Sequence, residues 1–191
     1  MRNAKLYILS GLPGSGKTTV ARRLVKRLRA VHVRVDTIEQ GLRDLCGWKV
    51  QGEGYRLAYR IAKDNLRAGV SVVADSVNPW HLTRKEWAET AIGVGAAYVN
   101  IEIMCSDPAT HRARVETRPG DIPGLRLPTW EEVTARDYQP WQENRLRLDT
   151  AGEDVDASVA RLLEMLRDVD RCGGEAVHRT AGPRKTGSLL F

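Results

Sequence analysis

The chain has 191 residues, of which 42% are hydrophobic and 28% are charged, with a formal net charge of +6. These values are ordinary for a soluble protein of one domain. No apolar run approaches the roughly 20 residues that a membrane-spanning helix needs. Residues 1–5 lead directly into an apolar segment, so we expect no secretory leader. Three cysteines have no metal or redox spacing, so we expect a cytoplasmic protein with reduced thiols and no membrane partner.

The first predicted strand, residues 6–9, runs into the most informative segment of the chain. Residues 11–18 read Gly-Leu-Pro-Gly-Ser-Gly-Lys-Thr, a complete G-x-x-x-x-G-K-[ST] phosphate-binding loop. Such a loop turns backbone N–H groups toward a phosphate, and the helix predicted over residues 20–28 adds the positive end of its dipole. We therefore expect ATP as the cofactor. Its predicted contacts are Gly11, Pro13, Gly14, Ser15, Gly16, Lys17, Thr18, Thr19 and, from a later segment, Arg114.

Hydrophobic periodicity predicts the remaining elements. Strands are expected at residues 31–35, 70–74, 96–104 and 146–149. Helices are expected over residues 55–66, from the Asn-Pro pair at 78–79, over 107–116, from a capping box at 129–132, and over 155–166. Strands alternating with helices indicate an α/β fold with a five-stranded parallel sheet covered on both faces. We expect one domain over residues 1–169 and a poorly ordered tail over residues 170–191.

Two predicted strands end in an aspartate, at the edge where open α/β sheets bind ligands. Lys17 is expected to contact the β- and γ-phosphates, while Thr18 and Asp75 hold Mg²⁺. Asp36 is the candidate base that orients an acceptor hydroxyl and takes its proton. A capping role at a helix starting near Thr37 is the alternative for Asp36.

Arginines precede a Pro/Gly-rich segment over residues 118–128, which has the layout of a mobile lid. Arg114 and Arg118 are four residues apart and can share one helix face. A guanidinium can stabilise the charge that spreads over a migrating phosphoryl group, so we predict a catalytic role for both. A solvated basic helix is the alternative interpretation.

Two absent patterns narrow the class of nucleotide-binding protein. No Asn-Lys-x-Asp segment occurs, which argues against a GTPase switch. The strand ending in Asp75 continues with Ser76 rather than a second acid, which disfavours a motor that activates water. A kinase that phosphorylates a hydroxyl group is therefore the favoured function.

The chain resembles the small P-loop kinase-like ATP-binding proteins, a group that includes polynucleotide kinase, adenylylsulfate kinase, chloramphenicol phosphotransferase and the zeta toxins. The similarity is carried by residues 11–18, by Val35-Asp36 with the downstream Arg43, by residues 72–79, and by residues 114–120. It implies sheet order 2-3-1-4-5, with Asp75 beside the phosphate loop, Asp36 one strand further out and an Arg-bearing lid over the phosphates. Arg43 lies further from Asp36 than in polynucleotide kinases.

The acceptor stays open between two classes. A small molecule would bind in a closed pocket walled by Trp48 or Trp80, although packing is the plainer interpretation of both tryptophans. A nucleic acid with a 5′-hydroxyl would need a basic groove, for which the candidates are Arg43, Arg56, Arg60, Arg84 and Lys85. The six basic side chains of residues 21–35 lie mostly in the first predicted helix, which we expect to pack behind the sheet and away from the acceptor. We favour the small acceptor. A nucleotide-binding regulator without catalysis is the alternative from another class, and the oligomeric state is not predicted.

Overall fold

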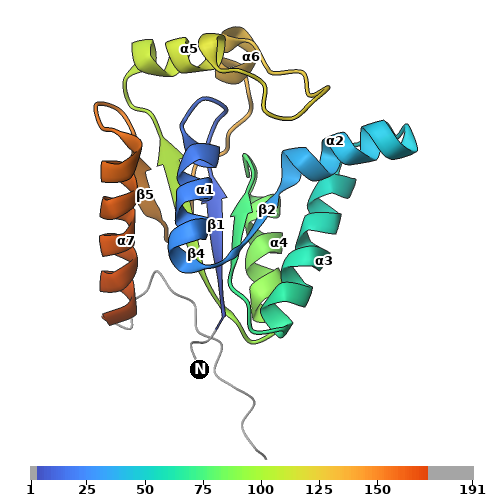
Figure 1. The fold of residues 1–191 in the computed structure, drawn as a ribbon, viewed down its shortest axis with the longest axis vertical. Helices are drawn as coiled ribbons and strands as arrows, with labels where there is room; N and C mark the ends of the chain where they lie inside the picture. The colour runs from blue at the N-terminus through green and yellow to red at the C-terminus, as the bar shows by residue number, and fades with distance from the viewer. Residues whose placement is uncertain (1–3, 172–191) are drawn as a thin grey trace, which may run out of the picture.

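A computed structural model describes residues 4–171, and it shows a single parallel sheet between layers of helices (Figure 1). The strands are β1 Lys5–Ser10, β2 Val31–Arg34, β3 Val72–Asp75, β4 Ala97–Met104 and β5 Leu146–Asp149. Each neighbouring pair is parallel, and the order is β2-β3-β1-β4-β5. The fold class and strand order expected from the sequence are confirmed.

The helices are α1 Lys17–Leu28, α2 Val35–Cys46, α3 Glu53–Arg67, α4 His81–Ile92, α5 Pro108–Thr117, α6 Trp130–Thr134 and α7 Val155–Arg171. Figure 1 shows α1 and α7 on one face of the sheet and α3 and α4 on the other. Helices α5 and α6 lie beyond the carboxyl ends of the strands, above the loop between β1 and α1. None of the helices within residues 4–171 combines the length and hydropathy that crossing a membrane requires.

Strand β1 shows how the sequence divides the core between the two faces. Side chains alternate along a strand. Leu9 therefore packs with Leu24 of α1 and Leu162 of α7, whereas Ile8 belongs to the core on the opposite face of the sheet. That second face includes Trp87 of α4, which is fully buried. Burial on both faces explains why β1 and β3 read as nearly continuous apolar runs.

Two junctions differ from the sequence-based expectation. Strand β2 stops at Arg34, and Val35 already begins α2, so Asp36 lies in the first helical turn and does not end a strand. A carboxylate is favourable there because the amino end of a helix carries partial positive charge. Helix α4 starts at His81 rather than at the Asn-Pro pair, because Asn78 adopts a left-handed φ of 47°.

The end of the chain is described up to the last residue of α7. This helix continues to Arg171, so Asp170 and Arg171, placed in the expected tail, are helical. The rest of that expected tail, residues 172–191, lies outside the described residues. The capping box predicted at residues 129–132 is confirmed at the start of α6.

Candidate functional site

The loop that joins β1 to α1 can follow its path only with glycine at two positions. A Cβ on Gly11, whose φ is +149°, would stand 2.2 Å from the carbonyl oxygen of Ile103. A Cβ on Gly14, whose φ is +84°, would stand 2.4 Å from a methyl carbon of Val115 in α5. The loop is thus confined between β4 below and α5 above, which fixes the direction of its backbone N–H groups.

The start of α1 has the features of a phosphate site. Gly16 is the N-cap residue and supplies no side-chain hydrogen bond, and the first turn contains no acid. The Ser15 hydroxyl oxygen is buried without a hydrogen-bond partner. Unpaired N–H groups, a helix dipole and an unsatisfied hydroxyl together fit the phosphates of a nucleotide. Thr18 and Thr19 follow in the first turn, the former partly buried and the latter exposed.

Lys17 and Asp75 form a buried ion pair at the carboxyl edge of the sheet. The ammonium nitrogen of Lys17 lies 2.9 Å from Oδ1 of Asp75, and Nε2 of His32 lies 3.2 Å from Oδ2. Burial raises the pKa of Asp75, but the charge of Lys17 and the hydrogen bonds of His32 and Lys17 outweigh burial and lower it. Each carboxylate oxygen of Asp75 thus has one hydrogen-bonding partner and keeps a further lone pair, as direct or indirect binding of Mg²⁺ would need.

Helix α2 places two carboxylates at the same edge of the sheet. Asp36 lies in the first turn, within electrostatic range of Arg34 and Arg118. Glu39 lies one turn later and accepts a hydrogen bond of 3.2 Å from Arg43. Burial raises the pKa of Glu39 despite that partner. A partly buried carboxylate with a raised pKa is suited to take a proton, and Glu39 joins Asp36 as a candidate base.

Helix α5 closes over the phosphate loop. His111 makes a contact of 2.8 Å between its Nε2 and the carbonyl oxygen of Pro13, and its ring packs edge-on against Trp130 of α6. Arg114 donates to Thr150 through both terminal nitrogens, at 2.8 Å to the hydroxyl and 3.0 Å to the carbonyl oxygen. Thr150 in turn donates to the carbonyl oxygen of Ser15 at 2.9 Å. Arg114 is thereby held at the loop through Thr150.

Arg118 follows α5 and is half-buried, with an Nε atom that lacks a hydrogen-bond partner. The segment over residues 118–128 then crosses toward α2. There Gly124 approaches Gln40, since a Cβ on Gly124 would lie 3.0 Å from the side-chain nitrogen of Gln40. The same segment carries Asp121, which binds Arg34 at the end of β2. The lid expected from the sequence therefore bridges the phosphate loop and α2.

Some residues considered for the acceptor side lie elsewhere. Trp48 and Trp80 are 53% and 46% exposed, and neither lines the hollow beside β2 or the one between α3 and α4. Arg84, which we considered for a basic groove, is only 1% exposed. It donates to backbone carbonyls of residues 78, 79, 139 and 140 and stacks on Trp141 at 4.1 Å.

Sequence reasoning missed the polar face of β2. His32 and Arg34 are two residues apart, so they project from the same side of the strand, and both approach Asp75. The alternation of Val-His-Val-Arg-Val contains this signal. Their partner Asp75 is more than 40 residues away, and only the order of the strands brings them together.

The sheet order and the phosphate loop are those of a kinase-type P-loop NTPase. The chain belongs to the AAA domain family, whose match covers residues 6–136. Two curated relatives are similar to the chain over most of its length. The chain is 28% identical over 181 residues to an adenylyl-sulfate kinase of Halothermothrix orenii, covering 88% of this chain and 93% of that protein.

A second relative is the bifunctional enzyme NodQ of Azospirillum brasilense, at 30% identity over 166 residues. This match covers 82% of the chain but only 26% of NodQ, so the chain corresponds to about a quarter of that protein. Among solved structures, the fold is similar to Mycobacterium tuberculosis APS kinase CysC in complex with AMPPNP and APS. The TM-score is 0.64 at 18% identity, over 86% of this chain and 98% of that one.

Proposed function

We propose that this protein is an ATP- and Mg²⁺-dependent kinase that transfers the γ-phosphate to a hydroxyl group of a small molecule. One juxtaposition carries the proposal. The phosphate-loop lysine meets a buried carboxylate, Asp75, while a second pair of carboxylates, Asp36 and Glu39, lies on α2 at the same edge of the sheet. Phosphoryl transfer to an alcohol needs both a phosphate-binding half and a proton-accepting half.

Each half has residues suited to its task. ATP with Mg²⁺ supplies the electrophilic phosphoryl group when bound. Lys17, freed from Asp75, neutralises charge on the β- and γ-phosphates, and Thr18 offers a hydroxyl ligand for the metal. Asp36 holds the acceptor hydroxyl and accepts its proton as the oxygen bonds to the γ-phosphorus and the bond to the β-phosphate oxygen breaks. Arg118 lies within electrostatic range of Asp36, and it stabilises the negative charge of the phosphoryl group during transfer.

The burial and ion pairs of the basic residues considered for a groove support a small acceptor over a polynucleotide. Three of the five candidates are engaged within the protein: Arg84 is buried, Arg43 pairs with Glu39, and Lys85 pairs with Glu89 at 3.7 Å. Arg56 and Arg60 are exposed on α3. The kinase class is supported by the adenylyl-sulfate kinase relative. The substrate in that relative's name belongs to that relative, and a transfer screen identifies the acceptor of this chain.

The test is a transfer screen with ATP labelled in the γ-phosphate. Candidate acceptors are nucleosides, sugars, sulfated nucleotides, antibiotics and short 5′-hydroxyl oligonucleotides, with Lys17→Ala as the inactive control. Labelled product from a small acceptor supports the proposal. Tight ATP binding with no transfer to any acceptor would favour the regulator.

The salt dependence of oligonucleotide binding discriminates between the two acceptor classes. Binding to a single strand loses affinity with a log–log slope of about −0.7 per phosphate contact. Sub-micromolar affinity with a steep slope would overturn the choice of a small acceptor in favour of a 5′-hydroxyl polynucleotide kinase. Weak binding with a shallow slope agrees with the small acceptor.

A further inference from the structure

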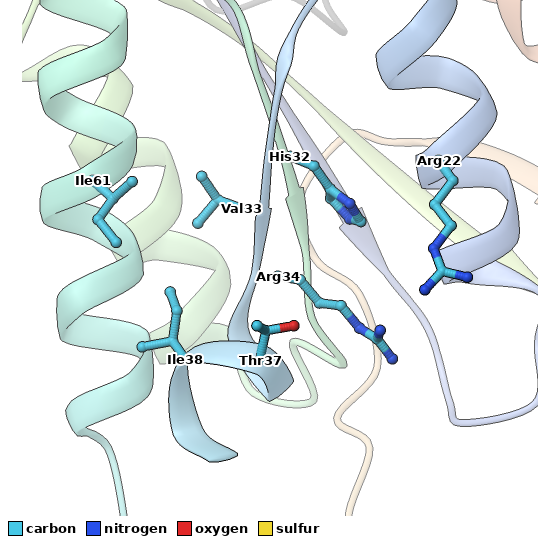
Figure 2. A pocket seen from close by; sticks show the side chains of 7 residues that line it. All are labelled: Arg22, His32, Val33, Arg34, Thr37, Ile38 and Ile61. Carbon is cyan, nitrogen blue, oxygen red and sulfur yellow. The ribbon is translucent and has the colours of Figure 1, made fainter. Parts of the chain in front are cut away.

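Asp121 of the lid segment is held by two arginines from distant parts of the chain. Arg34, at the end of β2, donates through both terminal nitrogens, at 2.6 Å and 3.1 Å. Arg22 of α1 donates to one of the same carboxylate oxygens. Figure 2 shows the two guanidinium groups turned toward each other in the space between α1 and β2. A forked arrangement of this kind matches the oxygens of a carboxylate, phosphate or sulfate.

The arginines around Asp121 have more hydrogen-bonding capacity than the protein satisfies. The Nε atoms of Arg34 and Arg118 are both buried without a hydrogen-bond partner. Arg118 lies within electrostatic range of Arg34 and Asp121. Buried donors without partners cost free energy, so this cluster is incomplete as it stands.

The charge balance depends on the position of Asp121. With Asp121 in place, its carboxylate and those of Asp36 and Asp75 oppose the cationic side chains. If the lid segment withdraws Asp121, only Asp36 and Asp75 face the four cations Lys17, Arg22, Arg34 and Arg118. Asp75 is already engaged by Lys17 and His32, so Asp36 would be the one remaining carboxylate of this group for three arginines. An anion entering at this point would restore the balance.

There is room for such an anion beside the arginines. A cavity of about 270 Å³ is lined on one side by Arg22, His32 and Arg34 and on another by Ile38 and Ile61. In Figure 2 the two isoleucines lie across β2 from the basic side chains. The hollow therefore runs along the edge of β2, with its basic side chains on one face of the strand and its apolar side chains on the other.

We propose that Arg22, Arg34 and Arg118 form an oxyanion subsite for the phosphoryl acceptor, and that Asp121 occupies it until an anionic group of the acceptor takes its place. The inference rests on the proposed function and adds that the acceptor carries a phosphate, sulfate or carboxylate group. The geometry indicates that the anionic group bound here belongs to the acceptor and is not the γ-phosphate of ATP. Nε of Arg34 is the nitrogen nearest Asp75, at 4.0 Å, whereas its terminal nitrogens face Asp121.

The experiment titrates sulfate into protein saturated with Mg²⁺ and a non-hydrolysable ATP analogue, at constant ionic strength, with binding followed by calorimetry. Filling the phosphate loop first prevents sulfate from binding there. We expect saturable binding in the wild type that becomes about tenfold or more tighter in Asp121→Asn, because the internal competitor loses its charge. Arg34→Gln should abolish it, and Arg34→Lys should weaken it by losing the fork.

Arg23→Gln is the matched control, since Arg23 lies on the same helix as Arg22 and pairs instead with Asp156. This variant should bind sulfate like the wild type. Equal affinities in the wild type and Asp121→Asn would overturn the inference. So would binding that occurs with ADP but disappears with the ATP analogue, because the subsite would then belong to the γ-phosphate.

Failure of the proposed function is distinguishable in the same samples. If the ATP analogue does not bind, the kinase proposal fails at that step. The subsite is then tested in nucleotide-free protein, where tighter sulfate binding in Asp121→Asn than in the double variant Asp121→Asn/Arg34→Gln still reports it. If the analogue binds and sulfate does not, the kinase proposal stands and the subsite is refuted.

Discussion

The ammonium group of Lys17 and the carboxylate of Asp75 are 2.9 Å apart, and their side chains are only 8% and 1% exposed. This pair joins the phosphate loop to the neighbouring strand β3. Removing one member of a buried ion pair leaves the other charge without compensation, which typically costs about 3–5 kcal/mol. Lys17 therefore has two roles that a single substitution cannot separate, one in stability and one in binding phosphate.

A double substitution separates these roles. Lys17→Ala should lower both phosphoryl transfer, by at least ~10²-fold, and the free energy of unfolding, by about 3–5 kcal/mol. Lys17→Met combined with Asp75→Asn removes both buried charges and should recover most of the stability while transfer stays lost. Chemical denaturation and the transfer assay measure the two quantities. Recovery of transfer in the double variant would refute the role of Lys17 at the phosphates.

The two carboxylates of α2 can be compared directly. If Asp36 is the base, Asp36→Asn should keep ATP affinity within a few-fold and lower transfer by ~10²–10⁴-fold. Glu39→Gln tests the other candidate base, because it removes a carboxylate from the same helix and leaves Arg43 a neutral acceptor. Calorimetric titration with ATP and single-turnover transfer give the two readouts. A larger loss of transfer in Glu39→Gln would reverse the assignment.

Magnesium should be needed for transfer and not for folding. Within residues 4–171, no group of three or more His, Cys, Asp or Glu side chains is arranged to hold a metal ion. We expect the phosphates of ATP, the Thr18 hydroxyl and the Asp75 carboxylate as its ligands. A chelator should abolish transfer and leave the melting temperature of the nucleotide-free protein unchanged. A melting temperature that falls in chelator alone would reveal a structural metal.

The pairing of Asp121 with Arg34 predicts a particular pH dependence. Hydrogen bonds from Arg34 and its positive charge lower the pKa of Asp121 to about 2. A carboxyl group with a depressed pKa stabilises the folded state fully above its unfolded pKa, near 3.8, and loses that contribution as the pH falls toward about 2. The difference in unfolding free energy between wild type and Asp121→Asn should therefore be constant above about pH 5 and shrink below pH 4.

Nuclear magnetic resonance of the carboxyl carbon tests the same property in the folded state. The resonance of Asp121 should titrate well below pH 3.8 in the wild type and move toward that value in Arg34→Gln. An unshifted midpoint in the wild type would show that the lid segment is not held by this pair in solution.

Local patterns predicted the phosphate loop, because its glycines and its lysine perform their task within eight consecutive residues. The capping box at Thr129 and Glu132 was predictable for the same reason. The junction at Arg34 was not, since Val35 and Asp36 are compatible with either the end of a strand or the first turn of a helix. At this junction the side chain of Arg34 binds Asp121, which lies 87 residues later in the chain.

The assignment of Arg84 illustrates a second limit of sequence reasoning. A charged residue in a helix is normally exposed, so sequence alone placed Arg84 on a surface groove. The structure buries it because four carbonyl groups and the ring of Trp141 surround its guanidinium. Those partners come mainly from residues 139–141, a segment without a periodic pattern that could have announced the contact.

Arg84 should be a stability residue and not a nucleic-acid contact. Its guanidinium fastens residues 139–140 to the turn at residues 78–79, beside the end of β3. Arg84→Met keeps much of the side-chain volume but leaves these carbonyl groups unsatisfied, so we expect a loss of about 3 kcal/mol or more in unfolding free energy. Lys85→Met is the matched control, because Lys85 is the next residue, exposed and paired only with Glu89. Denaturant unfolding should show little change for Lys85→Met. If Arg84→Met unfolds like the wild type but loses affinity for a 5′-hydroxyl oligonucleotide, the buried position of Arg84 and our preference for a small acceptor are both wrong.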